Sequence, residues 1–162
     1  MLLRYHGAIF RGDLQRMPSD AGETHHRLPV RVYYEDTDAG GVVYHARYLH
    51  FMERARSEWL RVLGFEQDRL RDEQGVLFAV RRMDIAFVQP ARFNQLLRVE
   101  SALAGCGPAS MEFAQRVVRA GDDTLCCRAT VNIACIDAGR LRPTRIPEDM
   151  MTAILPEIAH GR

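Results

Sequence analysis

Residues 46–64 read ARYLHFMERARSEWLRVLG, and their hydrophobic pattern has the period of an α-helix. The apolar positions recur at steps of three and four: Tyr48, Leu49, Met52, Ala55, Trp59, Leu60 and Leu63. Charged and polar residues occupy the other side, and Gly64 is a typical C-terminal stop. The pattern predicts an amphipathic helix of about five turns that buries one face.

The segments on either side of this helix alternate as β-strands do. Residues 28–34 place Val30, Val32 and Tyr34 on one side of a strand that precedes the helix. Four strand-like runs follow the helix, at residues 76–88, 96–104, 110–119 and 124–136. The turns between these runs contain Gly, Pro or Asp.

Two shorter helices complete the order of elements. One is expected over residues 67–74, ended by Gly75, and Pro147 can begin the last. Because helices and strands do not alternate, the order argues against a doubly wound parallel sheet and predicts an α+β fold. One long helix then covers one face of a five-stranded, mainly antiparallel sheet, and the edges left exposed favour self-association.

Composition excludes several classes of function. The chain has 162 residues, enough for one domain, and a formal net charge of +1, which gives no reason to expect a nucleic-acid partner. No apolar run approaches the roughly 20 residues that span a membrane. All 22 basic residues are arginines, since the sequence contains no lysine.

Cysteine usage and the first residues favour the cytoplasm. The four cysteines have no metal-site or small-domain disulfide spacing, so buried reduced thiols are expected: Cys106, Cys126, Cys127 and Cys135. Arg4 and Arg11 fall where a signal peptide needs an apolar core, which argues against export.

Residues 1–27 differ from the rest in their mixed polarity, and we expect a flexible leader before a domain over residues 28–162. Met17 is interpreted as the natural start, with residues 1–16 belonging to an over-long gene prediction.

Residues 34–45, YEDTDAGGVVYH, carry three carboxylates before a glycine pair. Asp36 and Asp38 resemble the magnesium loop of dehalogenase-type phosphatases, but that chemistry needs a lysine and a parallel sheet. His45 and His50 are five residues apart, so they lie on different helix faces and do not form a zinc pair. No metal site is therefore expected.

The remaining interpretation is catalysis where a strand gives way to a helix. The glycines allow a substrate to approach the backbone, and a helix start offers free N–H groups to a developing oxyanion. Val42, Val43 and Tyr44 are suited to exclude water. The residue pattern alone leaves open that Asp36 or Asp38 merely caps a turn.

Residues 31–56, RVYYEDTDAGGVVYHARYLHFMERAR, closely resemble the opening of hotdog-fold acyl-CoA thioesterases. The similarity is greatest to the YbgC-like branch of the 4-hydroxybenzoyl-CoA thioesterase family. It rests on the pattern D-x-D-x-x-G-x-V-x-[YH] joined to Y-x-x-[FY]-x-E-x-A-R, and it continues through residues 78–101 and 110–118.

The resemblance implies a hotdog fold, with the sheet wrapped around the long helix and chains paired edge to edge as a homodimer or homotetramer. It implies hydrolysis of acyl-CoA, or of acyl-carrier-protein thioesters, to an acid and a free thiol, with no cofactor. It also implies a cytoplasmic protein associated with the Tol–Pal envelope system.

The second aspartate of the D-x-D pair is catalytic in this family, which assigns Asp38 as nucleophile or general base. The backbone N–H that polarises the thioester carbonyl corresponds to His45, whose side chain is expected to orient water or, alternatively, to fix the loop. The expected substrate-binding residues are these: Gly41, Val42, Tyr44, Tyr48, Arg81 and Arg82.

Arg81 and Arg82 belong to that set because the turn at residues 105–109, basic in many relatives, is uncharged here; Arg92, Arg116 or weak phosphate anchoring are the alternatives left open. On the helix, Glu53 and Arg56 are expected to form a surface ion pair at i and i+3.

Two other functions on the same fold stay open. One is a non-catalytic module that binds acyl groups or proteins. The other is a dehydratase, which the histidine spacing fits less well.

Overall fold

The structure is a computed structural model, and it describes residues 26–159. The elements along the chain are β1 (His26–Arg31), η1 (Tyr34–Asp36), α1 (His45–Val62), α2 (Gln67–Gln74), β2 (Val76–Phe87), β3 (Leu96–Gly107), β4 (Ser110–Arg119), β5 (Leu125–Asp137) and α3 (Glu148–Ala159). His26 and Arg27 belong to β1, so this strand begins two residues earlier than expected. The leader up to residue 25 and the start at Met17 lie outside the described residues.

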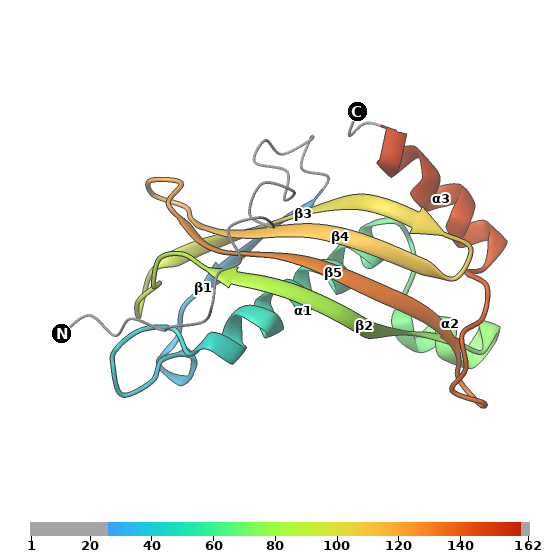
Figure 1. The fold of residues 1–162 in the computed structure, drawn as a ribbon, viewed down its shortest axis with the longest axis horizontal. Helices are drawn as coiled ribbons and strands as arrows, with labels where there is room; N and C mark the ends of the chain where they lie inside the picture. The colour runs from blue at the N-terminus through green and yellow to red at the C-terminus, as the bar shows by residue number, and fades with distance from the viewer. Residues whose placement is uncertain (1–25, 160–162) are drawn as a thin grey trace.

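The five strands form one antiparallel sheet in the order β1-β3-β4-β5-β2. The sheet curves around α1, which crosses one of its faces, while α3 lies at the far end beside β3 (Figure 1). This arrangement confirms the α+β prediction. β1 and β2 form the two edges of the sheet, so β2 has one side unpaired within the described chain.

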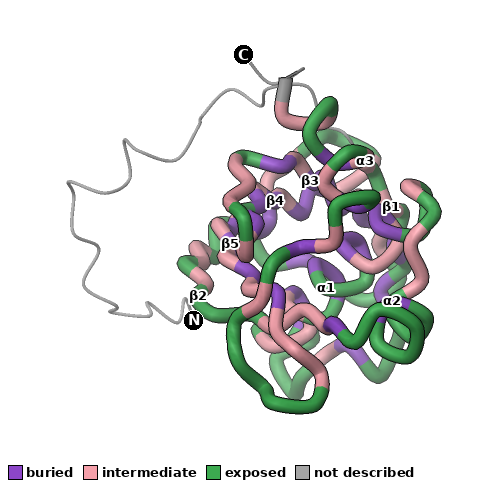
Figure 2. The backbone as a smooth tube through the Cα atoms, turned by 90° about the vertical axis from the view of Figure 1, so that its right-hand side faces the viewer, coloured by how far each residue is buried: buried purple, intermediate pink, exposed green. Residues whose placement is uncertain are grey.

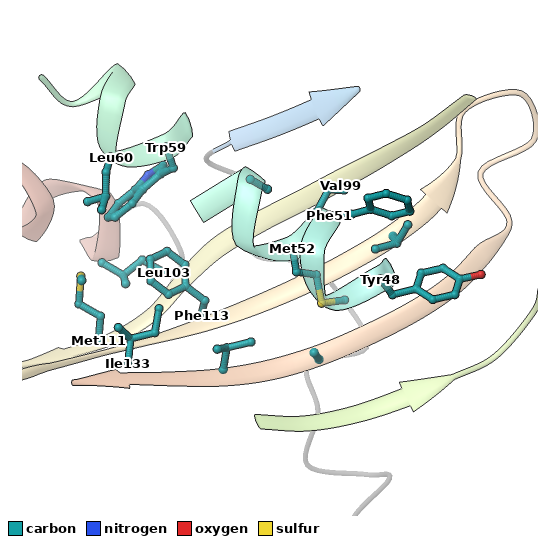
Figure 3. Packing of buried hydrophobic residues seen from close by; sticks show 14 of the residues in the cluster. Tyr48, Phe51, Met52, Trp59, Leu60, Val99, Leu103, Met111, Phe113 and Ile133 are labelled. Atoms are coloured by element: carbon teal, nitrogen blue, oxygen red, sulfur yellow. The ribbon is translucent and has the colours of Figure 1, made fainter. Parts of the chain in front are cut away.

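The core lies between α1 and the sheet, where buried residues gather on the inner side of the backbone (Figure 2). Helix α1 buries Tyr48, Met52, Ala55, Trp59 and Leu60 as expected. Figure 3 shows this stripe facing the strands, and the Trp59 ring meets Phe113 of β4 edge-on at 5.1 Å between ring centroids. Because burial of large apolar side chains is the main source of stability, this contact layer holds α1 in place.

The end of the first strand differs from the prediction. β1 stops at Arg31, and Tyr34, expected to face inward, has 83% of its surface exposed. The chain turns here because the Asp36 carboxylate accepts the N–H of Tyr33, which starts the single turn η1. The alternation of apolar residues therefore continues three residues beyond the strand itself.

The predicted surface pair between Glu53 and Arg56 is wrong. Arg56 lies on the inner side of α1 and is only 6% exposed, and its guanidinium donates to Gln115 of β4 at 2.7 Å. Glu53 instead accepts the hydroxyl of Ser57 at 2.7 Å. An arginine with a long apolar stem can occupy a core position when its head group finds a partner there.

The cysteines are free thiols, and Cys126, Cys127 and Cys135 are buried as the sequence predicts, whereas Cys106 near the end of β3 is only partly buried. Burial raises the pKa of Cys127 to about 12 and that of Cys135 to about 11. In residues 26–159, no helix combines the length and apolar character needed to cross a bilayer.

The Cys127 thiol predicts a loss of stability in alkali. Above about pH 9 the thiol ionises in the unfolded chain but stays protonated in the folded one, so stability falls as pH rises. From pH 8 to pH 10, the free energy of unfolding should therefore fall by about 1–1.5 kcal/mol more in wild type than in Cys127→Ala. Urea denaturation in the presence of a reductant measures the free energy of unfolding of each protein at the two pH values. Val131→Ala, a buried neighbour on the same strand, is the control and should keep the wild-type pH dependence; the same dependence in Cys127→Ala would refute the account.

Candidate active site

The loop between η1 and α1 closes on itself as a tight hairpin. Thr37 and Val43 form an antiparallel bridge, and the N–H of Asp38 donates to the carbonyl of Val42 at 3.0 Å. Gly41 sits at the tip with φ +70°, a conformation that side chains disfavour. Asp38 and Val42 are thus held opposite each other in this hairpin, and α1 begins three residues after Val42.

The Asp38 carboxylate is exposed, and its two oxygens have different surroundings. Oδ1 accepts the N–H of Gly40 at 2.8 Å, and a Cβ at Gly40 would lie 3.1 Å from that oxygen. Oδ2 has no hydrogen-bond partner among the described residues. The turn-capping role that the sequence left open is therefore present, but it occupies only one of the two oxygens.

Helix α1 begins at His45 without a side-chain cap. Tyr44 occupies the N-cap position and provides no side-chain hydrogen bond to the first turn. The first backbone N–H groups of a helix have no partner within it, and they carry the positive end of the helix dipole. The donors expected at His45 are therefore available to an oxyanion.

The His45 side chain is exposed and surrounded by aromatic rings. Its ring lies 4.3 Å from that of Tyr44 and 6.3 Å from that of Phe87, measured between centroids. No hydrogen bond joins it to Asp38 in the part of the chain that the structure describes. Asp38 lies in the hairpin and His45 at the helix start that follows it, and a direct contact between their side chains is not part of this geometry.

Asp36 holds both ends of the loop from inside. Its side chain is 2% exposed; one oxygen accepts the N–H of Tyr33 at 2.8 Å and the other accepts Nε of Arg47 at 2.6 Å. Its backbone carbonyl accepts the N–H of Tyr44 at 2.9 Å. Asp36 therefore joins the end of β1, the loop and the first turn of α1.

A second brace comes from the segment after β2. The N–H of Val43 donates to the carbonyl of Ala91 at 2.8 Å, and the N–H of Ala91 donates to the Tyr48 hydroxyl at 3.0 Å. Val42 bridges to Arg92 in the same segment. Burial raises the pKa of Tyr48 to about 12, so its hydroxyl stays neutral and acts as an internal acceptor.

Three residues of this site were not foreseen from the sequence. Arg47 pairs with Asp36. The Ala91 carbonyl accepts a hydrogen bond from Val43, and its N–H donates one to Tyr48. The ring of Phe87 faces those of His45 and Tyr48. Phe87 is half exposed at the end of β2, and only its place just before Pro90 could have suggested a role.

Arg81 and Arg82 lie apart from the loop in the single chain. They are exposed on β2, six and five residues before Phe87 respectively, which corresponds to roughly 16–20 Å along a strand. Arg82 pairs with Asp84 at 2.9 Å. No group of three His, Cys, Asp or Glu side chains that could hold a metal ion occurs within residues 26–159.

Comparison with known proteins agrees with this architecture. The sequence model of the thioesterase-like superfamily matches residues 32–154. Over 126 residues the chain is 47% identical to the acyl-CoA thioesterase YbgC of Haemophilus influenzae. The matched region covers 78% of this chain and 91% of that protein.

Solved structures extend the likeness. A probable thioesterase from Bartonella henselae is 38% identical with a TM-score of 0.71, covering 75% of this chain and 98% of that one. A 1,4-dihydroxy-2-naphthoyl-CoA thioesterase from Synechocystis shares the fold at 22% identity with a TM-score of 0.74, covering 80% and 94%. The predicted hotdog arrangement is confirmed.

Replacing Asp36 by Asn should destabilise the protein by about 2–3 kcal/mol, because a charge-assisted bond to Arg47 is lost in a largely buried position. Urea denaturation measures the change. Glu35→Gln is the matched control, since Glu35 is exposed and only 3.4 Å from the same guanidinium, and it should cost under about 1 kcal/mol. Equal losses in the two variants would contradict the role given to Asp36.

Proposed function

The chain belongs to the thioesterase-like superfamily, and from this premise we propose that it hydrolyses acyl-CoA thioesters to a carboxylic acid and a free thiol. The 47% identity to a protein named acyl-CoA thioesterase, over 91% of that protein, supports the substrate class. The single observation that supports the site is the free Oδ2 of Asp38 in the hairpin loop that leads into the uncapped start of α1.

The thioester carbonyl oxygen accepts hydrogen bonds from backbone N–H groups at the start of α1, with His45 as the first helical residue. These donors are fixed before the substrate arrives, so they stabilise the tetrahedral oxyanion without reorganisation. Removal of one such donor typically costs about 10²–10³-fold in rate.

Asp38 supplies the base or the nucleophile through Oδ2. In one route this oxygen attacks the acyl carbon, the thiolate leaves, and water hydrolyses the resulting mixed anhydride. In the other, the carboxylate takes a proton from a water molecule that attacks the same carbon, and the thiolate leaves from the tetrahedral intermediate. The bond from Gly40 to Oδ1 orients the carboxylate in both routes.

Aromatic and aliphatic side chains form the wall around this carbonyl. Tyr44, Phe87 and Val88 are each about half exposed although large and apolar. An acyl group or a second chain that covers them would exclude water and strengthen the hydrogen bonds to the oxyanion. Tyr48 contributes indirectly, because its hydroxyl holds the Ala91 segment against the loop.

The unpaired edge of β2 supports pairing of two chains into a homodimer, with a homotetramer as the further step. Val80 is half exposed on this edge strand, and Phe87 and Val88 follow at its end. Arg81 and Arg82 border the same edge, so we place their contact with coenzyme A phosphates at the boundary between two chains. Sedimentation of the purified protein as a monomer would contradict the pairing.

The acyl-carrier-protein thioester, the cytoplasmic location and the association with the Tol–Pal system stay predictions of the resemblance. The alternative of a non-catalytic binding module has one specific observation in its favour. Oδ1 of Asp38 caps a turn, and an aspartate can serve a loop in that way without any chemistry.

Asp38→Asn separates the two functions. Asparagine can keep the turn through its amide oxygen but cannot attack or accept a proton, so hydrolysis of acyl-CoA should fall by about 10²-fold or more. Release of free thiol from a series of acyl-CoA esters measures the rate, and circular dichroism checks the fold.

Asp137→Asn is the matched control for this substitution. The Asp137 carboxylate accepts the N–H of Gly139 at 3.0 Å, the same turn geometry at a distant site, so this variant should keep wild-type turnover. Wild-type turnover by Asp38→Asn would refute the proposed mechanism, and absence of hydrolysis by the wild-type protein would favour the binding module.

A further inference from the structure

Arg56 is a buried cation on the face of α1 that packs against the sheet. It is 6% exposed and follows Ala55 in a stripe that otherwise buries apolar or aromatic side chains. Its Nη1 donates to Oε1 of Gln115 at 2.7 Å. A guanidinium has five N–H donors, and this is its one hydrogen bond to the described residues.

Gln115 is itself fixed in one orientation. It is 1% exposed, and its Nε2 donates to the carbonyl of Met52 at 3.0 Å and to Oγ of Ser101 at 2.8 Å. Because both donors of the amide are used, its oxygen must face Arg56. The guanidinium is thereby held in place by a neutral group.

No carboxylate forms an ion pair with Arg56 in the described part of the chain. Glu53 lies one turn earlier, but it is exposed and accepts the hydroxyl of Ser57. Burial lowers the pKa of Arg56, and the negative charge of Glu53 only opposes that effect. A buried charge without a counter-ion is costly, and a neutral side chain would fill the same space at a lower cost.

A cavity of about 80 Å³ lies beside this guanidinium. Its lining comes from α1, the start of α2 and three strands. One side is apolar, formed by Leu60, Phe78, Val80, Met111, Phe113 and Ile133, and the other is polar, formed by Glu53, Arg56, Ser57 and Gln67. Figure 3 shows Leu60, Met111, Phe113 and Ile133 at one end of the core, away from Tyr48. At roughly 10–15 Å³ for each water-sized group, the cavity holds about five to eight such groups, close to the six or so non-hydrogen atoms of butyrate.

We propose that this cavity is an anion subsite, in which Arg56 binds the carboxylate of a short aliphatic acid and the surrounding apolar side chains hold its carbon chain. Arginine is well matched to a carboxylate, because two of its N–H groups can donate in parallel. Glu53 also lines the cavity, but its exposed carboxylate is bonded to Ser57 and its charge is screened by water.

The subsite is separate from the place of the thioester carbonyl. Eleven residues of α1 separate Arg56 from His45, which corresponds to about 16 Å along the helix axis. The carboxylate therefore comes either from the far end of an acyl group or from a free acid such as the hydrolysis product. Only this question of source rests on the proposed function; the anion subsite itself does not.

Binding of butyrate to the wild-type protein tests the subsite directly, with butyramide as its uncharged counterpart. Nitrogen-edited NMR should show butyrate, and not butyramide, shifting the signals of the Arg56 Nε–H and the Gln115 side-chain amide. Unchanged signals with butyrate, or equal shifts with butyramide, would overturn the proposal whether or not the protein hydrolyses thioesters.

Variants then assign the charge. Arg56→Met keeps an apolar stem of similar length and should weaken butyrate binding by about tenfold or more. Arg54→Met, on the exposed side of the same helix, is the control and should bind as wild type does. Should Arg56→Met fail to fold, Arg56→Lys keeps the charge without the two-pronged geometry and should bind with reduced affinity. Full affinity in a folded Arg56→Met variant would overturn the proposal.

Turnover distinguishes the two sources of the carboxylate. If the far end of the acyl group occupies the subsite, Arg56→Met should raise KM for an acyl-CoA that ends in a carboxylate and is long enough to span about 16 Å, and leave the matching ester that ends in a methyl group unaffected. If the free acid occupies it, the same substitution should abolish inhibition by butyrate while both esters keep their KM. Either result supports the anion subsite, whereas no change in any of these quantities contradicts it.

Discussion

The buried carboxylate of Asp36 is the constraint on which the geometry of the site depends. It holds the end of β1 through Tyr33 and the first turn of α1 through Arg47, and the carbonyl of the same residue holds Tyr44. A loop fixed at both ends has little freedom left to lose, so its glycine tip and Asp38 are positioned before any substrate binds. The two aspartates of this loop therefore differ: Asp36 has a structural role, and Asp38 is the carboxylate that we propose for the chemistry.

The start of α1 shows that stability is given up where the chemistry is proposed. A helix usually begins with Ser, Thr, Asp or Asn, whose side chain bonds a free N–H, and the absence of such a cap costs about 1 kcal/mol. Tyr44 occupies this position without a cap bond, so the donors at His45 stay free for an oxyanion. Asp36 and the hydrogen bond that the Ala91 N–H donates to the Tyr48 hydroxyl hold the helix start from other directions and offset that loss.

Periodic burial is the part of this fold that the sequence predicts well. The stripe of α1, the bounds of α2 at residues 67–74 and those of β4 at residues 110–119 are as expected, because each is set by a local pattern and a local stop. The pattern failed at Tyr34, where a side-chain hydrogen bond turned the chain, and at Arg56, where a polar partner from β4 lies 59 positions away in sequence. Phe87 became part of the site through a contact with a distant segment, and Arg47 through an ion pair across the loop; neither follows from a helical or strand period.

The central claim is that Asp38 and the start of α1 act on the same carbonyl. A crystal structure with an acyl-CoA analogue whose sulfur is replaced by a methylene group tests it directly, since the ketone binds but cannot be cleaved. The account predicts that the ketone oxygen lies within about 3 Å of the His45 backbone N–H. It also predicts that Oδ2 of Asp38 lies about 3–3.5 Å from the carbonyl carbon if Asp38 is the nucleophile. If Asp38 is the general base, Oδ2 instead lies within hydrogen-bond reach of a water molecule beside that carbon. A ketone bound away from this helix start, with the Asp38 carboxylate hydrogen-bonded only to the Gly40 N–H, would contradict this claim.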